Sequence, residues 1–232
     1  MIPKIIHYCW FGRKPKPKAV EKCIASWKKF CPDYQIIEWN EDNFDINMNG
    51  YTNMCYAEKK YAFLSDYVRL LVVEEHGGVY FDTDVEVVKS FNELLKYDAF
   101  YCFETPDFVA TGLGFGSVAH GKGIQSMVAE YDDLLDGTKG VIGCPNLNTS
   151  ALLRLGLQKN GQYQQLGSEV VLPSEYMNPF CPSTGILSKT ENTVSIHWYS
   201  GAWLKPWRRL RVKLMRPLHR VFGVDAFRRL RK

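Results

Sequence analysis

Two aspartates separated by one residue stand between two β-prone runs of the chain. Asp82 and Asp84 flank Thr83, with Val79–Phe81 before them and Val85–Val88 after them. Side chains two residues apart on extended backbone point to the same side, so these carboxylates repel each other unless a cation lies between them. Carboxylate oxygens suit Mg²⁺ and Mn²⁺, above all where substrate phosphates complete the coordination. The pattern therefore indicates a divalent-metal site, although Asp-Thr-Asp alone also occurs in plain surface loops.

A second pair of charges lies on the helix predicted just before these aspartates. Apolar residues recur at three- and four-residue spacing through Tyr61–Val72, and Gly77 is expected to end the helix. Asp66 and Arg69 are three residues apart, so they share one side of that helix. They interrupt its apolar stripe. We expect them either to form a buried structural ion pair or to project into the same pocket as the two aspartates.

A histidine late in the sequence is a further candidate. His197 lies in a β-prone run that begins at Thr193, and a loop containing Ser200 and Gly201 follows it. A lone histidine on a strand is most often a core residue with satisfied ring nitrogens. Imidazole is also a competent ligand for Mn²⁺. The residues alone leave both interpretations open.

The stretch SDYVRLLVVEEHGGVYFDTD resembles the DXD signature of retaining glycosyltransferases with the GT-A fold. More narrowly, it is similar to bacterial capsule and O-antigen transferases and fungal initiating mannosyltransferases (glycosyltransferase family 32), and to clostridial glucosylating toxins. The resemblance extends over residues 2–203. The residues that match the signature are Asp66, Arg69, Tyr80, Asp82 and Asp84.

The resemblance implies a nucleotide-sugar site at the strand that begins the chain. The family motif IHYxW, here IHYCW, places Tyr8 and Trp10 against the nucleotide base, where an aromatic ring can stack. Without the resemblance, Trp10 is equally well a core aromatic. Asn40 and Asn43 would by default cap or turn the chain, and the resemblance implies that one of them binds the base. The implied donor contacts are Tyr8, Trp10, Asn40, Asn43, Asp66, Arg69, Tyr80, Asp82, Ser200 and Trp203.

The resemblance also implies a metal and a catalytic set. The metal, Mn²⁺ or Mg²⁺, would be held by Asp82, Asp84 and His197, and the catalytic residues would be Asp66, Arg69, Asp82 and Asp84. Asp66 and Arg69 would grip the donor sugar and ribose. The chain departs from the family by having Trp198 in place of a second histidine and Ala202 in place of a serine. Ser200 is expected either to replace that serine or to leave its phosphate contact unmade.

The elements that must position these residues alternate between strand and helix. Strands are predicted at Ile2–Trp10, Tyr34–Trp39, Val79–Phe81, Val85–Val88, Tyr97–Glu104, Phe115–Ala119 and Val170–Leu172. Helices are predicted at Ala19–Phe30, from Tyr61 to Gly77, at Gly121–Leu135, and after an N-cap at Asn148 or Thr149, with Asp45–Cys55 irregular. This order predicts an α/β fold with a mostly parallel sheet flanked by helices and ligands at the carboxyl ends of the strands. The resemblance specifies the GT-A, Rossmann-like form.

Charge is distributed unevenly along the 232 residues. Residues 205–232 hold 11 of the 29 Lys and Arg and one of the 25 acids, which leaves 18 bases and 24 acids, a net of −6, in residues 1–204. We therefore expect a single GT-A domain over 1–204 and a basic amphipathic helical tail over 205–232. The tail either packs on the domain with its charges in water or binds an anionic membrane surface. The acidic domain offers no basic groove, so no nucleic-acid partner is expected.

Cysteine usage and hydropathy bear on location. The seven cysteines are scattered without CxxC spacing, which favours free thiols in a reducing cytoplasm. No signal-peptide pattern and no apolar run of membrane-spanning length is seen. The expected location is cytoplasmic, peripheral on the inner face of the cell membrane.

The implied function is metal-dependent, retaining transfer of a sugar from a nucleotide-sugar, a UDP-sugar more than a GDP-sugar, to a hydroxyl of a glycan. The acceptor is expected to be lipid-linked, in bacterial polysaccharide synthesis. Two alternatives remain: a degenerate nucleotide- or carbohydrate-binding module, and a sugar nucleotidyltransferase. A nucleotidyltransferase would carry a glycine-rich basic loop after its first strand, and Phe11–Lys18 resembles such a loop only weakly.

Overall fold

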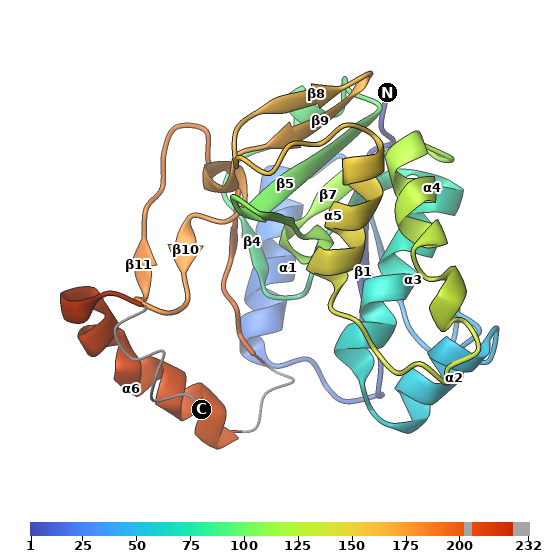
Figure 1. The fold of residues 1–232 in the computed structure, drawn as a ribbon, viewed down its shortest axis with the longest axis horizontal. Helices are drawn as coiled ribbons and strands as arrows, with labels where there is room; N and C mark the ends of the chain where they lie inside the picture. Colours follow the sequence, from blue (N-terminus) through green and yellow to red (C-terminus); the bar gives the residue numbers. More distant parts are fainter. Residues whose placement is uncertain (202–205, 225–232) are drawn as a thin grey trace.

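The structure is a computed structural model that describes residues 1–201 and 206–224 (Figure 1). Its main sheet has eight strands in the order β2-β1-β3-β7-β5-β9-β8, with β6 paired to β5. These are β1 (Ile5–Cys9), β2 (Gln35–Trp39), β3 (Gly78–Tyr80), β5 (Ala99–Thr105), β6 (Phe108–Val109), β7 (Phe115–Ser117), β8 (Gln164–Leu166) and β9 (Glu169–Leu172). Strand β1 is parallel to β2 and β3, and β5 is parallel to β9. Because β7 is antiparallel to both β3 and β5, all five of these strands run the same way, which confirms the predicted mostly parallel sheet.

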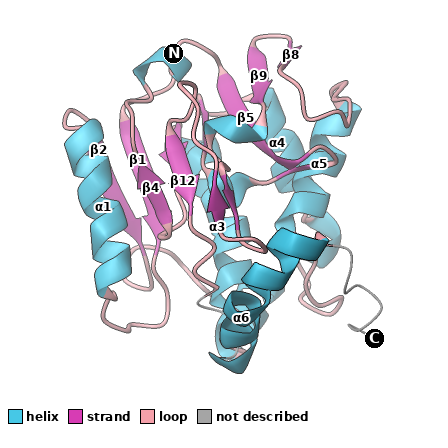
Figure 2. Ribbon diagram, turned by 90° about the vertical axis from the view of Figure 1, so that its left-hand side faces the viewer, coloured by secondary structure: helices cyan, strands magenta, loops and turns pink. Residues whose placement is uncertain are grey.

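Helices cover both faces of the sheet. They are α1 (Lys18–Phe30), α2 (Gly50–Ala57), α3 (Tyr61–His76), α4 (Lys122–Ala129), α5 (Cys144–Arg154) and α6 (Pro206–Phe222). In Figure 2, α1 lies on one side of the strands, and α4 and α5 lie on the other. The core is divided accordingly: one cluster contains Cys23 and Trp27 of α1, and the other contains Leu64 and Val68 of α3. Short 3₁₀ turns occur at Asn92–Leu94, Thr111–Leu113, Asp132–Leu134 and Ser174–Tyr176.

Two small strand pairs stand outside the main sheet. Strand β4 (Val85–Val87) is antiparallel to β12 (Ser195–His197), and β10 (Phe180–Cys181) is antiparallel to β11 (Ile186–Leu187). Helix α1 fixes the first pair, because the indole N–H of Trp27 donates to the Val85 carbonyl at 2.8 Å and Ser26 Oγ accepts from Val87 N–H at 2.9 Å. The first pair therefore brings the C-terminal segment of the sequence next to the Asp82–Asp84 turn.

The change from α3 to β3 depends on two adjacent glycines. Gly77 and Gly78 have φ of +64° and +115°, backbone that residues with a Cβ rarely adopt. A Cβ on Gly78 would also lie 2.8 Å from the Ile5 carbonyl oxygen and 2.9 Å from His7 Nε2. The chain therefore reverses close against β1 and leads directly into the aspartates.

Three sequence expectations about elements were wrong. The stretch Asp45–Cys55 is not irregular throughout, because α2 begins at Gly50, where Asn49 Oδ1 accepts from Thr52 N–H. The apolar residues of α2 form no clear stripe, so periodicity did not predict this helix. The predicted helix to Leu135 ends at Ala129. Helix α5 begins at Cys144, so Asn148 and Thr149 lie inside it and are not its N-cap; Pro145 in its first turn is the signal that was missed.

Candidate active site

The two aspartates lie at the carboxyl end of β3, in a tight turn. The N–H of Val85 donates to the Asp82 carbonyl at 3.0 Å, and this bond closes the turn between β3 and β4. Asp84 Oδ2 accepts from the backbone N–H of Ser200 at 2.7 Å. Ser200 thus holds Asp84 through its backbone amide, and its phosphate contact stays a prediction.

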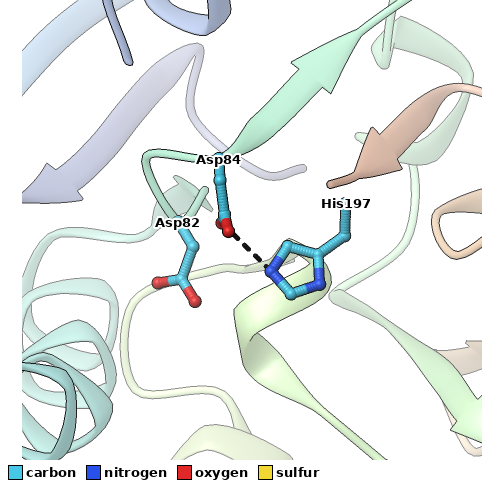
Figure 3. A group of neighbouring side chains, drawn as sticks. All are labelled: Asp82, Asp84 and His197. Atoms are coloured by element: carbon cyan, nitrogen blue, oxygen red, sulfur yellow. Dashed lines mark ion pairs between the residues drawn. The ribbon is translucent and has the colours of Figure 1, made fainter. Parts of the chain in front are cut away.

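His197 ends β12 opposite Val85, the first residue of β4. Its Nε2 lies 3.0 Å from Asp84 Oδ1, and Figure 3 shows the two side chains pointing at each other with Asp82 beside them. The other ring nitrogen, Nδ1, is buried and has no hydrogen-bond partner among residues 1–201 and 206–224. His197 is therefore not the fully satisfied core histidine that was the simpler alternative.

Arg69 joins the α3 pair to the aspartate turn. Its Nη2 lies 2.6 Å from Asp66 Oδ1 and 3.1 Å from Asp82 Oδ1, so one guanidinium nitrogen serves two carboxylates. The guanidinium also lies over the ring of Tyr80, 5.0 Å from its centre, and the Tyr80 hydroxyl donates to Asp82 Oδ1 at 3.1 Å. The Arg69 side chain is only 2% exposed. Asp66 and Arg69 thus form a buried ion pair and also belong to the same site as the aspartates.

The loop after β6 packs closely against Asp82 and Arg69. A Cβ on Gly112 would lie 2.6 Å from Asp82 Oδ2 and 3.1 Å from Arg69 Nη1, so only a glycine allows the loop to pass this close. Thr111 Oγ1 lies 3.4 Å from Arg69 Nη1 and 2.8 Å from the side-chain amide of Asn148 in α5.

Thr149 supports the same loop. Its hydroxyl oxygen accepts from Val109 N–H at 3.0 Å and lies 2.6 Å from the Pro145 carbonyl. Sequence reasoning missed these supporting residues, since they come from two segments with no motif of their own.

Burial and charge set the protonation of the site. Burial raises the pKa of Asp66 to about 6, and the attraction of Arg69 only partly opposes this. Burial also raises the pKa of Asp82 despite Arg69. Burial alone would raise the pKa of Asp84. The charge and hydrogen bond of His197 and the N–H of Ser200 outweigh burial and hold this pKa well below its usual range. Burial lowers the pKa of His197, and Asp84 reverses this, so that the net shift is upward. Asp84 and His197 thus each favour the charged form of the other.

The residues predicted at the nucleotide end gather around a cavity of about 240 Å³. Trp10, Lys16, Glu38 and Asn40 are among its lining residues, at the carboxyl ends of β1 and β2. Tyr8 is buried beneath it and hydrogen-bonds Glu38, whose carboxylate also pairs with Lys16 at 2.6 Å.

The other predicted donor contacts are less close to this cavity. Asn43 Oδ1 accepts from Asn40 N–H at 2.9 Å and its Nδ2 donates to the Glu38 carbonyl at 2.8 Å, so Asn43 fills the turn role that was its default. Trp203 lies outside the described residues.

The cluster suits a divalent cation. Asp82, Asp84 and His197 each offer one ligand atom, and these atoms all lie within 4.8 Å of one another. Two carboxylates and an imidazole are a donor set that fits Mn²⁺ or Mg²⁺. The side chains remain partly exposed, with 27% for Asp82, 19% for Asp84 and 12% for His197, so further ligands can reach an ion held there.

Part of the chain that contains this site is similar to a known protein family. Residues 17–101 match the family of glycosyltransferase sugar-binding regions containing a DXD motif. This part of the chain is thus similar to the sugar-binding regions of DXD glycosyltransferases. The match includes Asp66, Arg69, Asp82 and Asp84, which lie together in the structure, and it ends before His197.

Two curated relatives are named as glycosyltransferases. Inositol phosphoceramide mannosyltransferase 3 of Schizosaccharomyces pombe is 26% identical over 123 residues, 49% of this chain and 33% of that protein. An uncharacterised glycosyltransferase of Acanthamoeba polyphaga mimivirus is 27% identical over 107 residues, 44% of this chain and 43% of that protein. The matched region spans less than half the length of either relative.

Two solved glycosyltransferases share the fold. The PaToxG glycosyltransferase superposes with a TM-score of 0.54 at 22% identity, over 66% of this chain and 69% of its own. A glycosyltransferase involved in the glycosylation of the major capsid of PBCV-1 gives 0.51 at 10% identity, over 91% and 100%. At these identities the likeness concerns the fold, and it confirms the predicted GT-A architecture.

Proposed function

We propose that the chain is a divalent-metal-dependent, retaining glycosyltransferase that moves a sugar from a nucleotide-sugar to a hydroxyl of a glycan. The observation that carries the proposal is the Asp82–Asp84–His197 cluster joined through Arg69 to Asp66. Asp66, Arg69, Asp82 and Asp84 lie inside the matched residues 17–101, and His197 joins them from outside that range. A degenerate binding module would have no need of this charged assembly, since unpaired buried carboxylates destabilise a fold.

Bound Mn²⁺ or Mg²⁺ would supply Lewis-acid stabilisation of the charge that develops on the leaving diphosphate. Asp82, Asp84 and His197 are the residues that would hold it. Arg69 and the Tyr80 hydroxyl fix one oxygen of Asp82. The Ser200 amide fixes one oxygen of Asp84, so both carboxylates are oriented before any ligand arrives, which lowers the reorganisation needed during reaction.

The sheet order supports a direction for the donor. The cavity with Trp10 lies at β1 and β2, and the aspartates follow β3, the next strand along. A nucleotide-sugar with its base in the cavity, stacked on Trp10 and bonded by Asn40, extends its diphosphate to the aspartates. Asp66 then lies where it can bind the sugar, and Arg69, being buried, acts by orienting Asp66 and Asp82. We favour a UDP-sugar, because the cavity is small, as suits a pyrimidine base, and its lining carries both basic and acidic side chains.

The test is donor cleavage by the whole chain. A panel of UDP- and GDP-sugars with Mn²⁺ should yield released nucleoside diphosphate for at least one donor, and EDTA should stop the release. Asp84→Asn and His197→Ala should abolish it, whereas Glu93→Gln, at a 93% exposed carboxylate, should not change it. Full activity in EDTA would exclude a metal-dependent reaction. Formation of pyrophosphate from a nucleoside triphosphate and a sugar 1-phosphate, with no nucleoside diphosphate released from any nucleotide-sugar, would identify a nucleotidyltransferase.

Helix α6 supports membrane contact as part of the same proposal. It lies beside the β10–β11 hairpin in Figure 1, and three of its polar side chains contact the turn of that hairpin. Arg216 Nε donates to the Pro182 carbonyl at 3.1 Å, Arg220 Nε donates to the Thr184 carbonyl at 2.7 Å, and His219 Nδ1 lies 3.1 Å from the Ser183 carbonyl. The predicted apolar stripe consists of Leu210, Leu214, Leu218 and Val221, and all four are exposed.

This orientation is the reverse of an ordinary surface helix, whose apolar side faces the protein. An exposed apolar stripe on a basic helix fits an anionic bilayer, where each nearby base contributes about 1 kcal/mol. We propose that α6 holds the enzyme on the inner face of the cell membrane, where a lipid-linked glycan of bacterial capsule or O-antigen synthesis would be the acceptor. No helix among residues 1–201 and 206–224 is long and apolar enough to cross a bilayer. The predicted start of the tail at residue 205 lies outside the described residues. We also propose that the chain is related to glycosyltransferase family 32 and to the clostridial glucosylating toxins.

A further inference from the structure

A carboxylate that the proposed mechanism does not use stands at the carboxyl end of β5. Glu104 is half-buried, between the fully buried Phe103 and the exposed Thr105. Because side chains alternate along a strand, Glu104 shares a face with Cys102, which packs in the same core cluster as Val85 of β4. Glu104 therefore lies on the face of the sheet that carries the β4–β12 pair, at the end where the aspartates lie.

Two other segments of the chain fix Glu104. The Tyr199 hydroxyl donates to Glu104 Oε1 at 3.0 Å, and Asn178 Nδ2 donates to the Glu104 carbonyl at 2.9 Å. Tyr199 has φ of +49°, which is uncommon for a residue with a bulky side chain. Its ring centre lies 4.1 Å from that of His197. The backbone after β12 is thus held in an unfavourable conformation that brings the Tyr199 hydroxyl to this carboxylate.

Glu104 faces the metal cluster without belonging to it. The connection runs through Tyr199, whose hydroxyl binds Glu104 and whose ring lies against that of His197. The group of side chains close enough to share one ion nevertheless contains only Asp82, Asp84 and His197 among the described residues. Glu104 is therefore a carboxylate close to the reaction centre that a bound cation would not neutralise through direct contact.

The order of the strands indicates what such a carboxylate would meet. Along the sheet, the Trp10 cavity lies at β2 and β1, the aspartates follow β3, and Glu104 lies at the end of β5, beyond β7. A donor that begins in the cavity and crosses the aspartates has its sugar at or near β3. A molecule that approaches that sugar along this edge from the far side would meet Glu104.

We propose that Glu104, oriented by Tyr199, binds hydroxyl groups of the acceptor sugar. The inference rests on the proposed glycosyl transfer and names its acceptor subsite. A carboxylate with one oxygen fixed by a tyrosine still has lone pairs for two neighbouring hydroxyls, and hydrogen bonds to a charged acceptor are roughly twice as strong as neutral ones. The subsite takes a carbohydrate with adjacent free hydroxyl groups.

The experiment measures binding, so it does not require a turnover. Saturation-transfer NMR on the full chain with UDP and Mg²⁺ would titrate three probes: methyl α-D-mannopyranoside, methyl β-D-glucopyranoside and methyl β-D-galactopyranoside. At least one should bind the wild type. Glu104→Gln should weaken that binding about tenfold, the loss expected when a charged acceptor becomes neutral. Tyr199→Phe should weaken it severalfold, and Glu93→Gln, at an exposed carboxylate, should leave it unchanged.

Calorimetry with UDP and Mg²⁺ separates the other outcomes. Glu104→Gln should keep the UDP affinity within about twofold of the wild type. Failure of all three glycosides to bind the wild type, equal glycoside binding by Glu104→Gln, or loss of UDP binding in Glu104→Gln would each overturn the acceptor assignment. Glycoside binding that depends on Glu104, in a protein that cleaves no nucleotide-sugar, would instead refute the proposed transfer and keep the subsite.

Discussion

At the scale of single residues, Arg69 accounts for most of the site's organisation. Its guanidinium is shared by Asp66 and Asp82, and it lies over Tyr80. The sequence could place Asp66 and Arg69 on one side of a helix, because their spacing is a property of the helix itself. It could not decide whether the two side chains form a buried structural ion pair or project into the pocket that contains Asp82 and Asp84. The structure makes the pair both, since the second carboxylate that Arg69 contacts is one of the candidate metal ligands.

Removing the guanidinium should destabilise the fold strongly. Arg69→Met leaves two largely buried carboxylates without their cation, a loss of about 3–5 kcal/mol in the free energy of unfolding. Urea unfolding at pH 7 measures it. The loss should shrink at pH 5, because Asp66, whose pKa burial already raises to about 6, would then take up a proton. Arg13→Met, which breaks an exposed pair with Asp42, is the control and should change the free energy of unfolding far less, because water screens an exposed pair. An equal loss at both pH values would argue against an electrostatic cause.

Gly112 offers a test of how closely Asp82 is held. In Gly112→Ala the new methyl group would lie 2.6 Å from Asp82 Oδ2, so the carboxylate must move. Displacing a ligand in this way should reduce Mn²⁺ affinity about 10- to 100-fold, as changes to groups that orient ligands do. Free Mn²⁺ can be counted by electron paramagnetic resonance. Gly143→Ala is the matched control, because its nearest neighbour would lie 3.8 Å away; equal affinities in the two variants would contradict the proposed ligand role of Asp82.

At the scale of elements, a buried histidine links β1 and β2 to the turn that leads into the aspartates. Trp39 Nε1–H donates to His7 Nδ1 at 3.0 Å, so the proton of the neutral ring lies on Nε2, which donates to the Gly77 carbonyl at 2.8 Å. Burial lowers the pKa of His7 to about 4. The ring is therefore neutral in the folded protein and takes up a proton readily only when the chain unfolds.

This arrangement predicts a pH dependence of stability. Between pH 6.5 and 4 the unfolded chain holds a proton on His7 that the folded protein lacks, so stability falls as the pH is lowered through this window. The contribution is about 3 kcal/mol across the window. Asp66, with its raised pKa, acts in the opposite direction, so the measurement is the difference in slope between wild type and His7→Gln. Parallel urea-unfolding profiles for the two proteins would show that His7 is not the titrating group.

The elements that were predicted correctly are those with a strong local signal. The stripe in α1, the β-prone run of β1 and the paired glycines after α3 each determine local backbone without help from distant residues. Helix α2 and the start of α5 were misread because tertiary contacts decide them. Thr149 is a case in point: its preference for an N-cap position is overridden by bonds to Val109 and Pro145.

At the scale of the whole molecule, the site depends on contacts that no local pattern contains. His197 meets Asp84 only because β12 pairs with β4, and β4 is itself held by α1. The family resemblance anticipated the meeting of His197 with the aspartates, whereas Glu104, Tyr199, Gly112 and Asn148 had no motif that could mark them. The sequence therefore predicted which charged residues come together, and only the structure shows the residues that support them and the position of Glu104.

The orientation of α6 gives the last prediction. The full chain should co-sediment with phosphatidylglycerol-rich vesicles at low salt and be released at high salt, because screening weakens attraction beyond about 10 Å at 0.1 M salt. Arg211→Gln with Lys213→Gln should reduce binding at low salt by removing two exposed bases, each worth about 1 kcal/mol near the surface. Leu210→Ser with Leu214→Ser removes exposed apolar contacts instead, and it should leave the fold intact since these side chains are 57% and 67% exposed.

The two double variants separate charge from insertion. If binding depends on both, each variant loses part of it, and the salt dependence becomes shallower only in the Arg211/Lys213 variant. Lys139→Gln, at an ion pair on the domain, serves as the control for a general loss of charge. Unchanged sedimentation of both variants would remove α6 as the membrane contact. A loss confined to the leucine variant, with binding insensitive to salt, would show that the apolar stripe alone inserts and that the basic residues serve only to hold the helix on the β10–β11 hairpin.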